Sequence, residues 1–108
     1  MKQWYQITLH SQMGPREGKL FLHRKGDGTV RGILSLAGYE NPVRGTWDGA
    51  GMLTLFHSLR TALGDYACRS VLHLAGNTLR GTAELDGCRM KWSGAPLNEE
   101  QTEEKNCE

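Results

Sequence analysis

Apolar residues occupy every second position through most of the chain. The alternation runs through eight segments, which are residues 5–9, 20–22, 30–36, 43–47, 53–59, 68–74, 79–85 and 88–92. In the first segment, Tyr5, Ile7 and Leu9 alternate with Gln6 and Thr8. Successive side chains of a β-strand point to opposite faces, so a period of two predicts half-buried strands with one face toward water.

Turn-forming residues separate these segments at intervals of about 8–12 residues, a spacing typical of all-β domains. The turn signals are Gly14-Pro15, 26–28, Ala37-Gly38, Asn41-Pro42, 48–51, Gly64-Asp65, 75–77 and Asp86-Gly87. Parallel strands need crossover connections of about a dozen residues or more, and no connection here is that long. The spacing therefore predicts an antiparallel meander.

One stretch of the chain also fits a helix. Leu59, Leu63, Tyr66 and Ser70 lie at helical spacing, which leaves a short helix within residues 57–70 as an alternative. A glycine in the middle of this stretch disfavours that alternative, because glycine weakens a helix interior. We expect strands here too.

Three glycines decide between the two architectures open to a meander, a barrel and a pair of packed sheets. Gly32, Gly45 and Gly81 lie mid-strand on the apolar face, where glycine usually marks a bend or a close approach. A small barrel needs such bends to close. We therefore predict an all-β fold, an antiparallel meander of about eight short strands of six to nine residues that closes into a small up-and-down barrel.

The strand count, the mid-strand glycines and the inward tryptophans of residues 4–93 resemble small calycin-like barrels, the architecture of lipocalins and avidins. The resemblance implies the architecture of the chain. Trp4 lacks the glycine two residues earlier that would complete a lipocalin Gly-x-Trp motif. No functional residue of these families is carried over to this sequence.

The charge of the chain is divided between two regions. The 108 residues carry a formal charge of +1, but residues 97–108 hold five acids and one base, which leaves twelve bases and seven acids in residues 1–96. We expect one barrel domain over residues 1–96 and an acidic, disordered tail over 97–108, because the tail cannot bury enough apolar area to offset its ordering entropy. In a second hypothesis the tail lies across the basic body and masks it.

Cysteine use and the amino terminus bear on cellular location. No export signal and no run of about 18 apolar residues is visible, so we expect a cytoplasmic protein with reduced thiols and no transmembrane helix. Cys68 and Cys88 fall on strands that a third separates, about 9–10 Å apart. A disulfide needs Cα atoms within about 7 Å, so we predict none between them. Cys107, on the tail, is open to adventitious oxidation.

Motifs for metal binding and catalysis are missing from the sequence. His10, His23, His57 and His73 are scattered without the spacing of a zinc site, and no nucleophile elbow or phosphate-binding loop occurs. Three of the four aspartates lie in glycine-rich turns, where such side chains bond their own backbone, and these are Asp27, Asp48 and Asp86. We predict no metal, no cofactor and no enzymatic activity.

The inner face provides a candidate ligand site. His57, between two inward leucines, is either a core-edge histidine satisfied by a backbone carbonyl or Ser70, or a ligand-contacting group at the mouth of the barrel. The candidate ligand-binding residues are Tyr5, Trp47, His57, Ser70, Met90 and Trp92. Eight-stranded barrels are just wide enough to be packed solid or to hold one small ligand. The three inner glycines leave volume in the barrel, which either large neighbouring side chains or a ligand would occupy.

The outer face is rich in arginine, and Arg31, Arg44 and Arg80 form a candidate anion site. Binders of single-stranded nucleic acid also present aromatic rings among the cations. Few aromatics are available there beyond Trp4, Phe21 and Phe56, so we expect solvated arginines rather than a nucleic-acid site. Three functions follow, without a membrane partner: a small-ligand binding module, a filled barrel that forms homo-oligomers or binds a protein, and a binder of anionic polymers.

Overall fold

A computed structural model of the chain describes residues 2–11, 14–61, 64–85 and 87–97, and every regular element within them is a β-strand. The strands are β1 (Lys2–Ser11), β2 (Gly14–Arg24), β3 (Thr29–Leu36), β4 (Tyr39–Trp47), β5 (Met52–Thr61), β6 (Gly64–Ala75), β7 (Thr78–Leu85) and β8 (Cys88–Pro96). The predicted all-β class is confirmed. No helix in these residues is long and apolar enough to cross a membrane.

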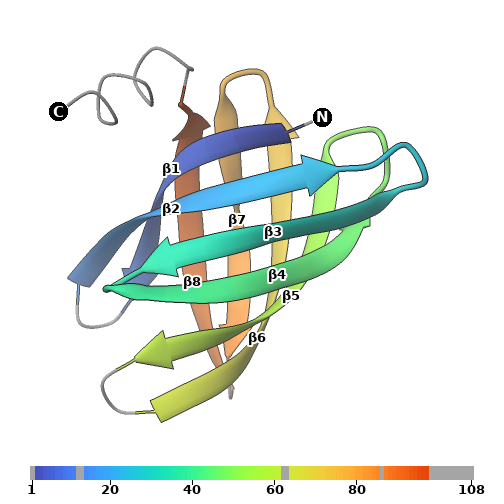
Figure 1. Cartoon of the computed structure of the whole chain (residues 1–108). Coiled ribbons are helices and arrows are strands. Elements are labelled where there is room, and N and C mark those ends of the chain that lie inside the picture. Colours follow the sequence, from blue (N-terminus) through green and yellow to red (C-terminus); the bar gives the residue numbers. More distant parts are fainter. Residues whose placement is uncertain (1, 12–13, 62–63, 86, 98–108) are drawn as a thin grey trace, which may run out of the picture.

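The strands form a closed meander (Figure 1). Each strand pairs antiparallel with the next in sequence, and β8 pairs with β1 to close the barrel. The connections of β1–β2, β3–β4, β5–β6 and β7–β8 therefore lie at one end, which we call the hairpin end. The other end, which we call the terminal end, holds the remaining turns and the start of β1.

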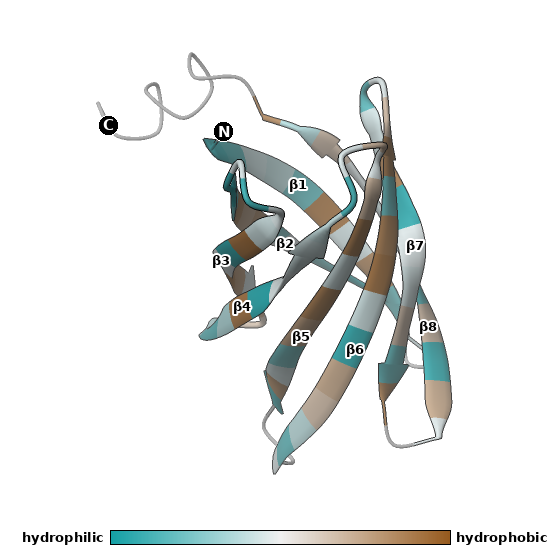
Figure 2. Cartoon of the chain, turned by 90° about the vertical axis from the view of Figure 1, so that its right-hand side faces the viewer, coloured by the Kyte–Doolittle hydropathy of each residue, from teal (hydrophilic) through white to brown (hydrophobic). Residues whose placement is uncertain are grey.

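The alternating pattern places the core inside the barrel as expected, and Figure 2 shows hydrophobic and hydrophilic bands alternating along β5 and β6. Among the described residues, eighteen apolar side chains form the buried core: Tyr5, Ile7, Leu9, Leu20, Leu22, Val30, Leu34, Leu36, Val43, Leu53, Leu55, Leu59, Cys68, Leu72, Leu79, Ala83, Met90 and Trp92. Three polar residues are buried among them, namely Asn41, His57 and Ser70. Cys88 departs from the prediction, because it begins β8 at the rim and is exposed.

The inner glycines mark places where neighbouring strands touch. A Cβ atom at Gly32 would lie 1.8 Å from the carbonyl oxygen of Phe21, and one at Gly45 would lie 1.9 Å from that of Thr54. No real Cβ contact is that short, so only glycine fits. The volume that a side chain would occupy at these positions is therefore filled by the backbone of the adjacent strand and adds no room to the barrel interior.

The strands are longer than predicted, at 8 to 12 residues. One predicted turn was wrong, because Asn41-Pro42 lies inside β4. The turn signals Gly14-Pro15 and Gly64-Asp65 mark the β1–β2 and β5–β6 connections, since Gly14 and Gly64 have positive φ and begin β2 and β6. Proline is tolerated where a strand lacks a neighbour on one side. The ladder between β4 and β5 stops at the pair Val43 and His57, so Pro42 lies beyond it.

Strands replace the alternative helix, because β5 continues to Thr61 and β6 begins at Gly64, with Leu59 paired to Tyr66. At the carboxyl end, the Leu97 amide donates to the Trp4 carbonyl over 2.8 Å, which attaches this first residue of the predicted tail to β1. The rest of the tail, residues 98–108 with Cys107, lies outside the described residues. Cys68 and Cys88 are both free thiols.

Candidate functional site

A histidine and a serine form a hydrogen-bonded pair inside the barrel at its hairpin end. His57 on β5 places its Nε2 atom 3.0 Å from the Oγ atom of Ser70 on β6. Its Nδ1 atom lies 3.1 Å from the carbonyl oxygen of Ser58. A carbonyl only accepts hydrogen bonds, so Nδ1 carries the proton and Nε2 accepts from the Ser70 hydroxyl. Both nitrogens of the neutral ring are thereby satisfied, as predicted for a core-edge histidine.

Burial controls the protonation of this pair. Desolvation lowers the pKa of His57, and its hydrogen bond to Ser58 opposes that shift. The ring is therefore neutral at pH 7. Cys68 lies beside the pair, with Sγ 3.9 Å from Ser70 Oγ. Desolvation raises the pKa of this thiol, so the buried group remains an S–H that can donate to the serine oxygen.

A tryptophan completes the group from across the barrel. The ring of Trp92 on β8 meets His57 edge to face, with centroids 6.1 Å apart and planes at 87°. Trp92 is only 3% exposed, and its Nε1–H finds no hydrogen-bond partner within the described part of the chain. A buried donor without a partner costs about 1–3 kcal/mol. Met90 on β8 lies in the same row of cross-strand partners as Ser70, two strands away through Ala83. We call the group of His57, Cys68, Ser70, Met90 and Trp92 the His57 cluster.

Two of the predicted site residues, Tyr5 and Trp47, lie at the terminal end instead. Trp47 pairs with Leu53, which precedes His57 by four residues on β5, a separation of roughly 13 Å along the strand. The guanidinium of Arg24 covers the Trp47 ring, with Cζ 4.6 Å from the ring centroid. Burial raises the pKa of Tyr5, and the positive charge of Arg24 opposes that rise. The six predicted residues therefore divide between the two ends of the barrel.

The predicted anion site is also divided. Arg31 on β3 and Arg44 on β4 are direct cross-strand partners, and both are exposed. Arg80 lies apart on β7, where its partners are His73 and Ser93. The structure thus brings together two of the three arginines and leaves the third on another part of the surface.

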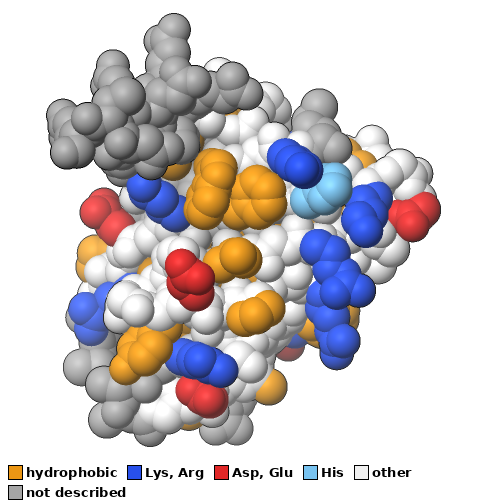
Figure 3. All heavy atoms as spheres, in the orientation of Figure 1, with side chains coloured by type: hydrophobic (Ala, Val, Ile, Leu, Met, Phe, Trp, Pro, Cys, Tyr) orange, Lys and Arg blue, Asp and Glu red, His pale blue; other side chains and the backbone are white. Residues whose placement is uncertain are grey.

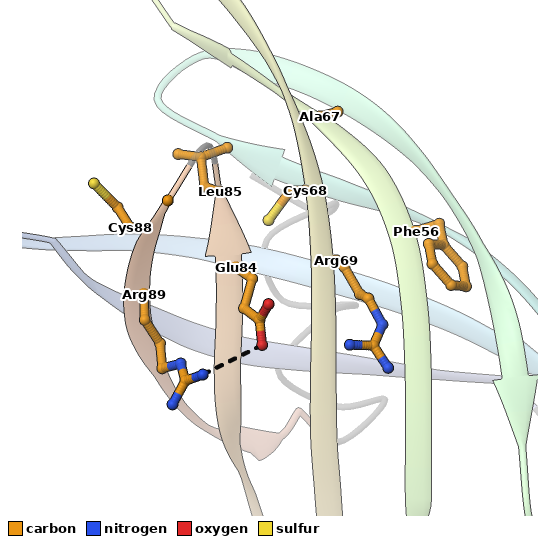
Figure 4. Close-up of a pocket in the computed structure, with 9 residues that line it drawn as sticks. Phe56, Ala67, Cys68, Arg69, Glu84, Leu85, Cys88 and Arg89 are labelled. Carbon is orange, nitrogen blue, oxygen red and sulfur yellow. Dashed lines mark hydrogen bonds and ion pairs between the residues drawn. The ribbon is translucent and has the colours of Figure 1, made fainter.

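A hollow of about 430 Å³ opens on the outside of β5–β8 near the hairpin end (Figure 4). It is lined by Phe56, Ala67, Cys68, Arg69, Glu84, Leu85, Gly87, Cys88 and Arg89. Arg69 stands between the Phe56 ring and the ion pair of Glu84 with Arg89, whose atoms are 3.5 Å apart. The hollow therefore combines an aromatic wall, a cation and an exposed thiol.

Sequence reasoning missed two inward polar residues. Asn41 donates from Nδ2 to the Leu34 carbonyl over 3.2 Å and accepts the Arg60 amide at Oδ1 over 3.0 Å. It thereby bridges β3 to β5 where the β4–β5 ladder has ended. The alternation of the strand was the available signal. Asn41 lies two residues from the inward Val43, and Arg24 lies two residues from the inward Leu22, so each shares the inner face.

The turn aspartates serve the backbone as predicted. Asp27 Oδ1 accepts from the Thr29 amide over 2.9 Å, and Asp48 Oδ1 accepts from the Ala50 amide over 2.7 Å. Asp86 lies outside the described residues. Among the residues that are described, no group of three or more histidine, cysteine, aspartate or glutamate side chains is placed to hold a metal ion.

Comparison with known proteins identifies the architecture. No protein-family model matches the chain, and no curated protein matches it by sequence. A redesigned β-barrel, mFAP1, solved bound to DFHBI, is similar with a TM-score of 0.64, over 89% of this chain and 93% of that chain. The two sequences are 11% identical, so the likeness shows the fold alone.

Proposed function

We propose that the chain is a binding module that takes one small amphipathic ligand at the His57 cluster. The observation that carries this proposal is the buried indole N–H of Trp92, which has no partner among the described residues. Polar groups in protein interiors are almost always hydrogen-bonded, and the exceptions often mark a place for a ligand or a water molecule. A hydrogen-bond acceptor on a ligand would satisfy this donor.

The surroundings of Trp92 define the chemistry of that ligand. Its polar group meets the indole N–H, and its apolar part packs against Met90 and the leucines of the core, which are 0–9% exposed. An apolar pocket with a few placed polar groups is the usual form of a small-molecule site. The resemblance to calycin-like barrels and the likeness to a barrel that holds DFHBI support the same proposal.

Binding is a better account of the cluster than catalysis. A serine 3.0 Å from a histidine is also the arrangement of a nucleophile and its base. The partner of the Nδ1 atom, however, is a neutral carbonyl rather than a carboxylate, and burial lowers the pKa of the ring, which makes His57 a weak base. A neutral, satisfied pair fixes the shape of the site instead.

The indole N–H itself provides the test. The chain has three tryptophans, so a ¹H–¹⁵N spectrum shows three indole signals, which Trp→Phe variants assign. The probe is 8-anilinonaphthalene-1-sulfonate, an amphipathic molecule with an anionic acceptor. We expect its addition to shift the Trp92 signal, and Trp92→Phe to weaken its binding about fivefold or more, the value of one buried hydrogen bond.

Two control variants keep the result specific. Trp47→Phe changes a tryptophan at the other end of the barrel, and Phe21→Ser removes an aromatic ring from the outer surface; both should change the affinity less than twofold. A Trp92 signal that does not move at saturating probe would overturn the proposal. The filled barrel that acts through its outer face would then be the better account, above all if sedimentation shows concentration-dependent association.

A further inference from the structure

Basic side chains on the outer face of the barrel lie in one row of cross-strand partners, in which Phe56 takes one position. Cross-strand pairs join Lys2 to His23, His23 to Arg31, Arg31 to Arg44, Arg44 to Phe56 and Phe56 to Arg69. We call these six residues, from β1 to β6, the cation row. Neighbouring strands are about 4.8 Å apart, so the row spans roughly 24 Å.

An apolar row runs beside the cation row, and on each of β1–β4 its residue is two positions from the residue of the cation row. It consists of Trp4, Phe21, Ile33 and Pro42, which are also successive cross-strand partners on β1–β4. The rings of Trp4 and Phe21 have centroids 5.1 Å apart, and Ile33 is 37% exposed. Figure 3 shows hydrophobic side chains down this face, with lysine, arginine and histidine side chains gathered beside them.

One residue of the cation row has an acidic cross-strand partner, since Arg69 lies opposite Glu84 on β7, which forms its ion pair with Arg89 instead. None of Arg31, Arg44 and Arg69 forms an ion pair with a residue in the described ranges. Like charges directly opposite one another destabilise a sheet, so the pair of Arg31 and Arg44 is a cost to the fold. The pKa of His23 is lowered, first by desolvation and then by positive charges that include Lys2, so the positive charge of the row comes from Lys2 and the three arginines. The unpaired guanidinium groups of the row are therefore available to bind an external polyanion.

An exposed aromatic ring interrupts the row. Phe56 is 47% exposed and lies between Arg44 and Arg69 on the neighbouring strands. It also forms a wall of the 430 Å³ hollow, next to Arg69. Among the described residues its ring has no aromatic or cation–π partner, and such an exposed ring offers a surface on which a planar group can stack.

We propose that the outer face of β1–β6 binds single-stranded nucleic acid, with phosphates along the cation row and unpaired bases on the apolar row and on Phe56. A basic track beside aromatic rings is the arrangement that binds single strands without reading their sequence. A duplex offers its phosphates but hides its base faces, and a lipid surface offers no planar groups to stack on Phe56. The observations therefore favour a single strand.

Fluorescence anisotropy of a labelled 20-nucleotide thymidine oligomer tests the proposal with the full chain. We expect Arg31→Ser/Arg44→Ser to weaken binding about tenfold at low salt and to reduce the slope of log K against log salt by about 1.4, because each phosphate contact on a single strand contributes about 0.7. Phe56→Ser should weaken binding about fivefold or more without changing that slope.

Arg80→Ser is the matched control, since Arg80 is an exposed outer-face arginine away from both rows. It should retain more than half of the wild-type affinity. Circular dichroism and thermal unfolding confirm that each variant folds. The proposal is overturned if Arg80→Ser weakens binding as much as the double variant, if the matching duplex binds as tightly as the single strand, or if vesicles with one-fifth phosphatidylserine bind and the oligomer does not.

Discussion

The Nε2 atom of His57 lies 3.0 Å from the Ser70 hydroxyl inside the barrel, and the Nε2 atom of His10 lies 3.0 Å from the Ser93 hydroxyl outside it. The two pairs have the same chemistry and the same distance but opposite surroundings. Water can replace the serine beside His10, whereas nothing replaces Ser70 beside His57. The chain thus contains its own control for the value of burying this hydrogen bond.

Ser70→Ala should lower the free energy of unfolding by about 1–3 kcal/mol, because it leaves the Nε2 acceptor of His57 buried without a donor. Ser93→Ala should change it by less than about 0.5 kcal/mol, as for most surface substitutions. Urea unfolding followed by circular dichroism measures both. Equal effects of the two substitutions would mean that the His57–Ser70 hydrogen bond contributes no more than an exposed one.

Stability should decrease as the pH falls from 7.5 to 5.5. The pKa of His57 is lowered in the folded chain, so the unfolded chain binds a proton as the pH passes about 6.5 while the folded chain does not. The free energy of unfolding then falls with decreasing pH, by at most about 1.4 kcal/mol per pH unit for one such group. Urea unfolding at several pH values measures this slope.

His57→Gln should reduce the slope, since the variant has no proton to gain at that position. Part of the slope should remain, because the pKa of His23 is lowered as well. Gln6→Ala, an exposed substitution on β1 that removes no titratable group, serves as the control and should leave the slope unchanged. An unaltered slope in His57→Gln would show that this ring is not the group that titrates.

The sequence predicted which side chains face inward for most of the barrel, with Cys88, Asn41 and Arg24 as the exceptions. A period of two holds in every strand, so the parity of one residue determines the face of all its neighbours, and Tyr5, Trp47, His57 and Trp92 all point inward as expected. The closure of the meander followed from the mid-strand glycines. Both inferences depend on local geometry, which a sequence encodes directly.

The sequence did not reveal at which height in the barrel each inward residue lies. Height depends on the offset between paired strands, and that offset is a property of the whole closed sheet. Trp47 and His57 share a face, yet the pairing of Trp47 with Leu53 places them at opposite ends. The same offset aligned Arg31 with Arg44 and left Arg80 elsewhere. Asn41 was assigned to a turn because its dipeptide with Pro42 is common in turns.

Asn41→Ala should lower the free energy of unfolding by roughly 2–4 kcal/mol, because it removes two hydrogen bonds and leaves the Arg60 amide without its acceptor. Hydrogen exchange at the Arg60 amide should accelerate more than exchange at amides of the β2–β3 ladder. Asn77→Ala, in the exposed turn before β7, should change neither quantity. Unchanged exchange at Arg60 would contradict the bridging role of Asn41.

Gly45→Ala should destabilise the barrel by more than about 3 kcal/mol or prevent folding, because the new Cβ atom would meet backbone atoms of β5 at 1.9 and 2.9 Å. Gly26→Ala is the control, since a Cβ atom there meets nothing within 4 Å. It should be neutral or slightly stabilising. Thermal unfolding and soluble yield measure the difference, and a Gly45→Ala variant as stable as Gly26→Ala would contradict the close approach of β4 and β5.

Arg31→Glu should stabilise the fold while it weakens the proposed binding of single-stranded nucleic acid. The substitution replaces a like-charge cross-strand pair with an opposite-charge pair to Arg44, which is worth about 0.2–1 kcal/mol. The gain should shrink as salt increases, because both side chains are exposed and screened. Urea unfolding at 20 and 500 mM salt measures the gain, and oligomer anisotropy measures the loss. A variant less stable than the wild type at low salt would show that the two arginines do not oppose each other.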